Sequence, residues 1–358
     1  MRPPDVIVAW LQNDYGQLGR PAEAIAHALV DEGLARRVAY VEPFVPGDGE
    51  SVLERKVIRG LDVYAGHGAA IRPGELAQAI VANSRLSEPI LLNFGVGEAN
   101  WTFLHEFRPY CERTVLVTHD KLAEWDAFAP RRDQLERIRR ALIGASDVVA
   151  GLSHGSIDDV PDAHYVGHGC DDLWTRPGVD DAAEPADLAL IPRPRATYVG
   201  ALSVRVEAEA LRALARSGVS VVLVGFSPSP AVRAVIDSEP NVHFLGPRAP
   251  DQTPAYLLHS DVGIIPHTDE PFTYSMEPHK AYNYACAGLH TVTLNVAHAP
   301  ALDGFLTQTS DVADFVAAVH TAERLPDDDL AAARQITWAS VAEKLLQTAA
   351  AGVATTRY

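Results

Sequence analysis

The sequence predicts an α/β protein of two domains, each with a parallel sheet covered by helices on both faces. Short apolar runs alternate with amphipathic segments along most of the 358 residues, a length that suits two domains. The alternation is interrupted at residues 174–195, which are rich in Pro, Asp and Ala and have little apolar periodicity. We interpret this stretch as a linker between an N-terminal domain, 1–175, and a C-terminal domain, 190–334.

Composition narrows the functional classes. Apolar residues make up 47% of the chain, which is ample for buried cores, and the net charge is −17 from 47 acidic and 30 basic residues. A nucleic-acid polymer or an anionic membrane needs a basic face, so neither is expected as the main partner. A nucleotide needs only one or two local cations, and it remains compatible with this composition.

Cysteines and apolar runs indicate a cytoplasmic location. The three cysteines, Cys111, Cys170 and Cys286, have neither the spacing of a disulfide framework nor that of a metal site. The N-terminal apolar run is too short for a signal peptide, and no later run reaches membrane-spanning length. We therefore expect no transmembrane segment and no bound metal.

The first half contains four long strands and four helices. Strands are expected at 5–10, 38–41, 89–94 and 114–120, with two short ones at 147–153 and 163–169, and helices at 21–32, 75–82, 101–107 and 131–144. The 131–144 helix has apolar residues at helical spacing and arginines on the opposite face. Residues 44–70 stay unassigned apart from a strand at 56–58.

The second half repeats this alternation. Strands are expected at 196–200, 220–225, 241–246, 262–265 and 290–294, and helices at 206–217, 231–238, 253–259, 278–287, 311–322 and 328–350. The helix at 278–287 starts at Pro278, which suits a first helical turn, and ends before Gly288.

The loop at 266–277 is the strongest candidate site. A loop that leads from a parallel strand to a helix N-terminus is where α/β sheets bind anions. This loop and the helix start carry the reactive side chains His267, Asp269, Glu270, Thr273, Ser275, Glu277, His279 and Lys280. A solvated connecting loop is the simpler interpretation, but this density of reactive groups favours a binding site.

A second loop should face the same edge of the sheet. The strand at 196–200 ends in Gly200, which lets backbone approach a ligand, and Arg205 follows as a forked cation. An ordinary turn with a surface arginine is the alternative. Together with Lys280, however, two cations on one edge suit a diphosphate.

Two features of the first half are weaker indications of a binding site. Gly95 and Gly97 after a strand resemble a dinucleotide-binding turn, but Asn100 stands at the third glycine position, which disfavours a dehydrogenase. His119 ends the 114–120 strand, where it could contact a sugar hydroxyl or diphosphate, move a proton, or simply cap the next helix. Trp10, Asn13, Asp14 and Gly16 occupy the corresponding edge of the first strand, which would face a cleft between the domains.

From residue 196 onward the chain resembles the C-terminal, nucleotide-sugar-binding domain of GT-B glycosyltransferases, chiefly family four and its relatives. The resemblance rests on YVGALSVR, SVVLVG, NVHFLGPR and EPHKAYNYACAGLHTV, the last being similar to the family run P-x-K-x-x-E-Y-x-A-x-G-x-P-V. In the first half VAYVEP, TVLVTHD, SDVVAGLS and GHGCDDLW resemble the acceptor-side domain. This implies two Rossmann-like domains facing across a cleft, with a C-terminal helix, 335–358, crossing back to the first domain.

The resemblance also implies site residues. It places the donor on Gly200, Arg205, His267, Ser275, Lys280 and Asn283. The family's Glu-x7-Glu pair falls at Ser275 and Asn283: Asn283 can still bond ribose hydroxyls, whereas Ser275 is a poor substitute that Glu277 or Glu270 would have to replace.

The expected reaction is metal-independent transfer of a sugar from a nucleotide-diphosphate sugar to a hydroxyl of a small molecule, lipid carrier or glycan, with no other cofactor. The candidate catalytic residues are His119, Asp14 and Glu277. In an inverting enzyme Asp14 or His119 would be the base, and a retaining enzyme would need none. Two alternatives remain open: a nucleotide-sugar epimerase of the same fold, and a non-catalytic nucleotide-sugar-binding protein.

Overall fold

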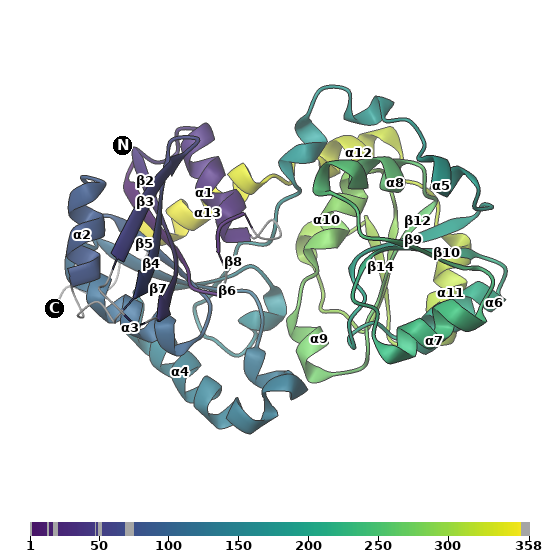
Figure 1. Cartoon of the computed structure of the whole chain (residues 1–358), viewed down its shortest axis with the longest axis horizontal. Coiled ribbons are helices and arrows are strands. Elements are labelled where there is room, and N and C mark those ends of the chain that lie inside the picture. The colour runs from purple at the N-terminus through teal and green to yellow at the C-terminus, as the bar shows by residue number, and fades with distance from the viewer. Residues whose placement is uncertain are drawn as a thin grey trace. The chain divides into compact units, whose positions relative to one another are not determined.

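The chain forms two compact units in the computed structural model, which describes residues 2–12, 14–16, 21–46, 48, 52–68 and 75–351. Unit 1 is Met1–Gly167 with Trp338–Tyr358, and unit 2 is His168–Thr337. Each unit is a sheet between layers of helices, as each half of Figure 1 shows. The stretch expected to link two domains, 174–195, lies inside unit 2, where it contains the short helix α5 (Ala186–Ala189).

Unit 1 is built on a sheet of order β3-β4-β2-β1-β5-β6-β7-β8 among the described residues. The strands are β1 (Asp5–Trp10), β2 (Arg37–Pro46), β3 (Val52–Ile58), β4 (Leu61–Gly68), β5 (Ile90–Phe94), β6 (Arg113–Thr118), β7 (Val148–Gly151) and β8 (His164–Tyr165). The helices are α1 (Pro21–Asp31), α2 (Glu75–Asn83), α3 (Glu98–Phe107), α4 (Arg132–Ala145) and α13 (Trp338–Ala351). All neighbouring strands are parallel except β3 and β4.

The β3–β4 hairpin corrects the expectation of a purely parallel sheet. It occupies most of the stretch left unassigned from the sequence, and the possible strand at 56–58 is the end of β3. The strand β3 lies at the edge of the sheet and is largely exposed, so its sequence lacks the buried apolar run that identifies a central strand. The apolar periodicity of the sequence therefore could not predict the full length of this strand.

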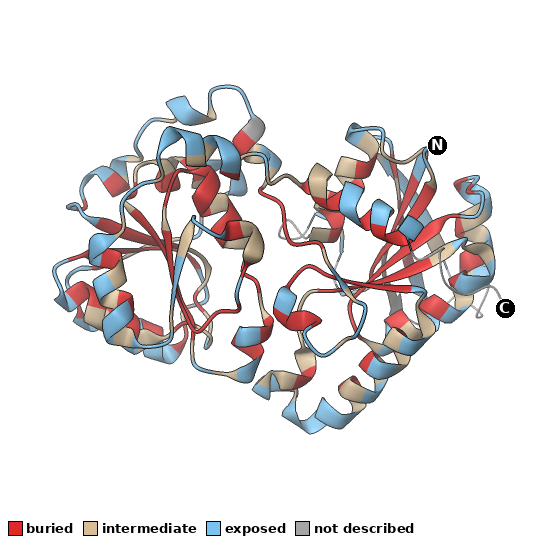
Figure 2. Cartoon of the chain, turned by 180° about the vertical axis from the view of Figure 1, so that it is seen from behind, coloured by how far each residue is buried: buried red, intermediate tan, exposed pale blue. Residues whose placement is uncertain are grey.

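Helices cover both faces of the first sheet. Buried residues of α1 and α13 share one core with inward side chains of β1, β2, β5 and β6, and buried residues of α2, α3 and α4 share a second core on the other face. The burial pattern in Figure 2 reflects this: the central strands are buried along their length, whereas helices are buried on one side only. Trp338, at the start of α13, is 2% exposed and belongs to the first of these cores.

Unit 2 is a parallel sheet of order β11-β10-β9-β12-β13-β14. Its strands are β9 (Arg195–Ala201), β10 (Ser220–Phe226), β11 (Val242–Gly246), β12 (Val262–Pro266), β13 (Thr291–Leu294) and β14 (Leu306–Thr309). Counted from its first strand, this order is the doubly wound Rossmann order 3-2-1-4-5-6. In Figure 1, α6 (Ala208–Arg216), α7 (Pro230–Ser238) and α11 (Val312–Thr321) lie along one face, and α8 (Thr253–Leu258), α10 (His279–Cys286) and α12 (Asp327–Ala333) along the other.

Helices at the candidate site and at the C-terminal end differ from the sequence prediction. The loop expected at 266–277 contains the short helix α9 (Pro271–Ser275), and α10 begins at His279, with Pro278 as its N-cap rather than its first residue. The single helix expected at 328–350 is divided into α12 and α13. The last residues of the expected C-terminal helix, 352–358, lie outside the described part of the chain. None of the described helices combines the length and the apolar character needed to cross a bilayer.

A buried arginine fixes the loop after β7 in unit 1. Arg139 of α4, whose side chain is 5% exposed, donates to both carboxylate oxygens of Asp159 at 2.9 and 2.6 Å and to the carbonyl of Ser156 at 3.1 Å. These hydrogen bonds lower the pKa of the Asp159 carboxyl from 3.8 to about 2. The pair is therefore fully charged above pH 3.8 and contributes less to stability as the pH falls toward 2.

The Asp159→Asn variant should lose about 1–2 kcal/mol of unfolding free energy at pH 7, because Arg139 is left buried with a weaker partner while half-exposed Asp159 is screened by solvent. Urea unfolding at several pH values would show this difference shrinking as the pH falls from 3.8 toward 2. The exposed pair Arg132–Asp126 provides a control, since Asp126→Asn should change stability by less than about 0.5 kcal/mol. An equal loss of unfolding free energy in both variants would contradict a stabilising role for the Arg139–Asp159 pair.

Candidate active site

The candidate site of unit 2 lies where the order of its strands reverses. The strands β9 and β12 are neighbours, and the chain leaves them in opposite directions along the sheet, to β10 and to β13. Ligands of open α/β sheets bind beyond the carboxyl ends of the strands at such a point. The loop after β9 carries Arg205, and the loop after β12 begins at His267.

Backbone hydrogen bonds hold these two loops together. The Glu207 N–H donates to the Pro266 carbonyl at 2.9 Å, and the Thr268 N–H donates to the Arg205 carbonyl at 2.9 Å. Between them, Val206 and His267 form an isolated antiparallel bridge. Arg205 and His267 are therefore positioned by the main chain rather than by flexible side-chain contacts.

Lys280 reaches the same edge from the second residue of α10. Its ammonium donates to the Tyr198 hydroxyl at 2.7 Å and lies 3.9 Å from the centre of the Tyr198 ring. Gly200 leaves room beside it, because a Cβ built on Gly200 would be 3.2 Å from Lys280 Nζ. Among the described residues no carboxylate lies within ion-pair distance of Lys280, so this ammonium is available to an anionic ligand.

Arg205 is the second cation of the site. One of its terminal nitrogens donates to the Met276 sulfur at 3.3 Å, and its guanidinium lies 5.8 Å from the centre of the Phe272 ring. Phe272 and Met276 come from α9 and the segment that follows it. The sulfur and the aromatic face attract the guanidinium weakly.

His267 is a buried neutral group between these cations. Burial, and then the positive charges of Lys280 and Arg205, hold the pKa of the His267 imidazole well below 6.5. Its side chain is 3% exposed, and its Nδ1 atom has no hydrogen-bond partner among the described residues. The bridge between Val206 and His267 places Arg205 beside His267, and Lys280 reaches the end of β9 at the same edge of the sheet, so the structure brings the three predicted donor-site residues together.

Ser275 and Glu277 point inward rather than toward solvent. The Ser275 hydroxyl donates to the Phe272 carbonyl at 2.7 Å within α9, and its side chain is buried. Glu277 is 4% exposed and accepts a short hydrogen bond from the Tyr282 hydroxyl. Donor contact by Ser275 and catalysis by Glu277 stay predictions, and both would require these internal contacts to be exchanged for contacts with a ligand.

Asn283 holds a loop in place. Its side-chain oxygen accepts from the Asp171 N–H at 3.0 Å and from the Trp174 indole at 2.9 Å, and its amide nitrogen donates to the Asp171 carboxylate at 2.7 Å. One turn earlier, His279 Nε2 lies 3.2 Å from the other Asp171 oxygen. These bonds use the Asn283 amide within unit 2, so the predicted contact of Asn283 with ribose also stays a prediction.

The candidate residues of unit 1 lie beyond β1 and β6. The His119 Nδ1 atom shares a hydrogen bond with Asp120 at 2.9 Å, which orients the ring, and Nε2 is a buried nitrogen with no partner among the described residues. Trp10, the last residue of β1, is 2% exposed and packs against His119 and Phe94. Asp14 is exposed and raises the pKa of Glu42, although burial is the larger cause of that shift.

The Gly95–Gly97 turn is a structural turn. Asn100, at the position of the missing third glycine, donates to Asn93 at 2.9 Å and to the Phe94 carbonyl at 2.8 Å, and it accepts from the Gly97 N–H at 3.1 Å. The Asn100 side chain therefore occupies the inside of the turn that a dinucleotide phosphate would need. This supports the choice made from the sequence against a dehydrogenase.

Sequence reasoning missed two tyrosines that shape the site. Tyr198 holds Lys280, and its hydroxyl also donates to the Ala201 carbonyl at 2.9 Å. The hydroxyl of Tyr284, a fully buried residue of α10, accepts from the Val199 N–H at 2.7 Å and so fixes α10 against the end of β9. Nothing in the sequence distinguishes these two tyrosines from other aromatic residues of strands and helices, because the partners of their hydroxyl groups are set by tertiary packing.

The two Rossmann-like domains give the chain the GT-B fold. Residues 193–323 match the model of the family described as Glycosyl transferases group 1, so the second unit contains a glycosyltransferase group 1 domain. The resemblance recognised in the sequence is thereby confirmed. No curated protein matches the chain significantly in sequence.

Solved structures of the same fold match nearly the whole chain. An α,α-trehalose-phosphate synthase (UDP-forming) from Burkholderia xenovorans, in complex with glucose-6-phosphate, has a TM-score of 0.70 at 11% identity, over 96% of this chain and 99% of that one. A structure described as trehalose-6-phosphate from E. coli bound with UDP-2-fluoro glucose has a TM-score of 0.62 at 12% sequence identity, over 96% of both chains. AviGT4, a glycosyltransferase involved in avilamycin A biosynthesis, has a TM-score of 0.63 at 12% sequence identity, over 99% of this chain and 100% of that one. At such low identity the likeness shows the fold alone.

Proposed function

We propose that the protein transfers a sugar from a nucleotide-diphosphate sugar to a hydroxyl group of an acceptor, without a metal ion. The observation that best supports this proposal is the position of Lys280. Its ammonium lies beside Gly200 at the point of strand reversal, and no carboxylate of a described residue lies within ion-pair distance. Arg205 is held at the same edge of the sheet by the backbone bonds between its loop and the loop of His267, so we assign both cations to one ligand position. The group 1 domain supports glycosyl transfer as the reaction.

The chemistry that the two cations would assist is departure of the diphosphate. The bond between the anomeric carbon and the diphosphate oxygen breaks, the acceptor oxygen forms a new bond to that carbon, and the acceptor loses its proton. Negative charge grows on the leaving oxygen during this step. Lys280 and Arg205 would stabilise that charge, helped by the positive N-terminal end of α10, as fixed charges do in other group-transfer sites.

The acceptor side is assigned to unit 1. His119 has the properties of a positioning group or a proton acceptor, because Asp120 holds Nδ1 while Nε2 has no partner among the described residues. Asp14 is the exposed alternative. If the reaction inverts the anomeric centre, one of them accepts the acceptor proton. If it proceeds with retention, the departing diphosphate oxygen takes the acceptor proton, so no protein base is needed and His119 positions the sugar.

A thermal-shift screen against UDP, GDP, TDP and ADP and their common sugars tests the proposal. A ligand present at a hundred times its Kd stabilises the native protein by about 2.7 kcal/mol, so one nucleotide series should raise the unfolding temperature clearly. The structural neighbours suggest UDP-glucose as the first donor and glucose 6-phosphate as the first acceptor. If none of the nucleotides raised the unfolding temperature, the donor-binding proposal would be wrong.

One alternative is favoured by a specific observation. Ser275 and Asn283, which stand where the family has its two glutamates, make hydrogen bonds within unit 2. A protein that binds a nucleotide sugar without transferring it would tolerate this. Product analysis separates the two functions: an active transferase forms free nucleotide diphosphate and a glycosylated acceptor, and a binding protein returns the donor unchanged.

A further inference from the structure

A second polar pocket lies in unit 1, at the opposite edge of the sheet from His119. It has a volume of about 410 Å³ and is lined by Arg36, Arg37, Val38, Arg55, Gly60, Asp62, Asn83, Ser84 and Arg85. The lining comes from the amino ends of β2 and β4, the end of β3 and the segment after α2, whereas His119 follows the carboxyl end of β6. We call it the arginine pocket. Its volume lies within the range of small-molecule sites.

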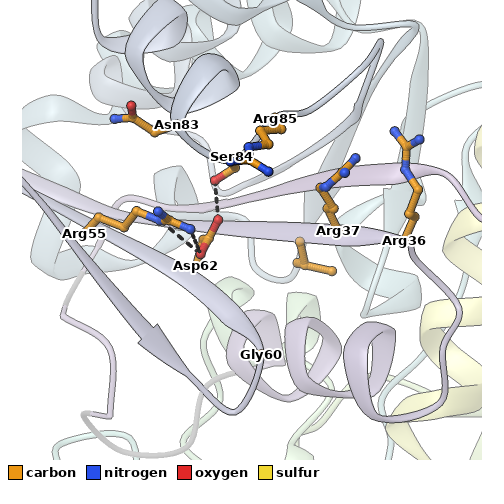
Figure 3. Close-up of a pocket in the computed structure, with 9 residues that line it drawn as sticks. Arg36, Arg37, Arg55, Gly60, Asp62, Asn83, Ser84 and Arg85 are labelled. Atoms are coloured by element: carbon orange, nitrogen blue, oxygen red, sulfur yellow. Dashed lines mark hydrogen bonds and ion pairs between the residues drawn. The ribbon is translucent and has the colours of Figure 1, made fainter.

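Two of its four arginines are neutralised by carboxylates. Arg36 donates to buried Asp5 through Nε at 2.7 Å and through a second, shorter bond, and the Ser87 N–H donates to the same carboxylate at 2.8 Å. Arg55 donates twice to one oxygen of Asp62, at 3.1 and 2.7 Å. The other Asp62 oxygen accepts from Ser84 at 2.5 Å. These groups form the fixed frame of the pocket, visible as the dashed contacts around Asp62 in Figure 3.

Arg37 and Arg85 are not neutralised in this way. Arg37 lies 3.9 Å from an Asp5 oxygen that Arg36 and Ser87 already use, and its side chain is 41% exposed. Arg85 is exposed, and its side chain makes no ion pair or hydrogen bond with any described residue. In Figure 3, Arg85 lies beside Ser84, and Arg37 lies between Arg85 and Arg36.

The carbonyl groups at the C-terminus of α2 would disfavour an anion here, but the chain itself occupies them. The N–H groups of Ser84, Arg85 and Leu86 donate to the carbonyls of Ile80, Ala82 and Val81 at 3.0, 3.1 and 2.9 Å. The four arginines of the pocket thus exceed the two carboxylates that pair with them, Asp5 and Asp62, by two positive charges. The protein as a whole has a net charge of −17. Forked guanidinium groups match the oxygens of a phosphate, and Asn83 adds an exposed amide for a neighbouring hydroxyl.

We propose that the arginine pocket binds a phosphomonoester, with Arg37 and Arg85 on the phosphate. The site is separate from the candidate donor site in unit 2 and from the His119 edge of unit 1, and it does not depend on the proposed transferase activity. Inorganic phosphate and glycerol 3-phosphate are the probes, because neither carries a nucleotide for the donor site.

Isothermal titration of the full chain at constant ionic strength tests this. Binding of both probes should weaken about tenfold or more in Arg37→Gln and in Arg85→Gln, since each removes a charge-assisted bond. Asp5, which lies 3.9 Å from Arg37, keeps its hydrogen bonds from Arg36 and Ser87, and Arg85 makes no ion pair with a described residue. Both variants should therefore fold as the parent does, which circular dichroism would check. Arg140→Gln, an exposed arginine of α4, and Lys280→Ala should bind the probes as the parent does.

Three results would overturn the proposal: no binding of either probe, binding unchanged in both pocket variants, or binding lost in Lys280→Ala. The phosphate could also belong to a lipid headgroup. Sedimentation with phosphatidylcholine vesicles, with and without phosphatidic acid, separates the two sources. Vesicle binding that requires Arg37 and Arg85, without binding of the soluble probes, would overturn the assignment to a soluble phosphomonoester.

Discussion

Replacing Lys280 with alanine should weaken donor binding about 10- to 100-fold, because a charge-assisted hydrogen bond to a diphosphate contributes about 1.5–3 kcal/mol. Turnover should fall further, by about 10²–10³-fold, since the charge that Lys280 meets increases as the diphosphate departs. The protein should stay folded. The Tyr198 hydroxyl keeps its hydrogen bond to the Ala201 carbonyl, and no described carboxylate loses an ion pair. Donor titration and steady-state kinetics at saturating donor measure the two effects separately.

The matched control is Lys344→Ala, which removes the same charge from an exposed position on α13. It should leave donor binding and turnover unchanged. Arg205→Ala should reproduce the loss of binding, because both cations serve one ligand position. If the donor bound normally to both Lys280→Ala and Arg205→Ala, the donor site would have been misplaced.

Substituting Gly225 with alanine should disrupt the site through the backbone. Gly225 and Gly200 are paired across β10 and β9, and a Cβ on Gly225 would lie 1.8 Å from the Gly200 carbonyl oxygen. That neighbour is main chain and cannot rotate away, so the two strand ends must separate. We expect a loss of about 3 kcal/mol or more in unfolding free energy, at the upper end of overpacking effects. Donor binding should be lost as well, because Gly200 moves relative to Lys280.

Urea unfolding and donor titration of the Gly225→Ala variant provide the measurement. Gly144→Ala is the control, since Gly144 lies within α4 and a Cβ there meets no atom within 4 Å. Alanine at that helical position should be neutral or stabilising by up to about 1 kcal/mol. A Gly225→Ala protein with the stability and donor affinity of the parent would show that the close approach of the two strands is dispensable.

Most of the fold was predictable because its central strands are buried on both faces. A continuous apolar run such as DVIVAW at 5–10 predicts a buried strand of a parallel sheet, and β1 has the same bounds. The exposed edge strand β3 carries no such signal, and the break between α12 and α13 follows from local turns rather than from periodicity. Helix α9 was missed because its five residues are too few for a periodic pattern.

The candidate site was predictable where chemistry and topology coincide. Arg205, His267 and Lys280 follow strand ends or begin a helix, so the expected sheet order was sufficient to bring them together. The internal contacts of Asn283 and Glu277 were not predictable, because their partners Asp171 and Tyr282 are set by tertiary packing. The arginine pocket was missed for the same reason, since its lining combines four distant segments that include the unassigned hairpin.

The path of the chain between the two units has a consequence for engineering. The chain passes from unit 1 to unit 2 after Gly167 and returns after Thr337. Near these points the Cys170 N–H donates to the Ile336 carbonyl at 2.8 Å, and Cys170 pairs with Thr337 in a parallel bridge. Unit 2 thus has the topology of an inserted domain whose ends are adjacent, an arrangement that favours excision and circular permutation. It could be produced as the single segment 168–337, whereas unit 1 requires residues 2–167 to be fused to α13.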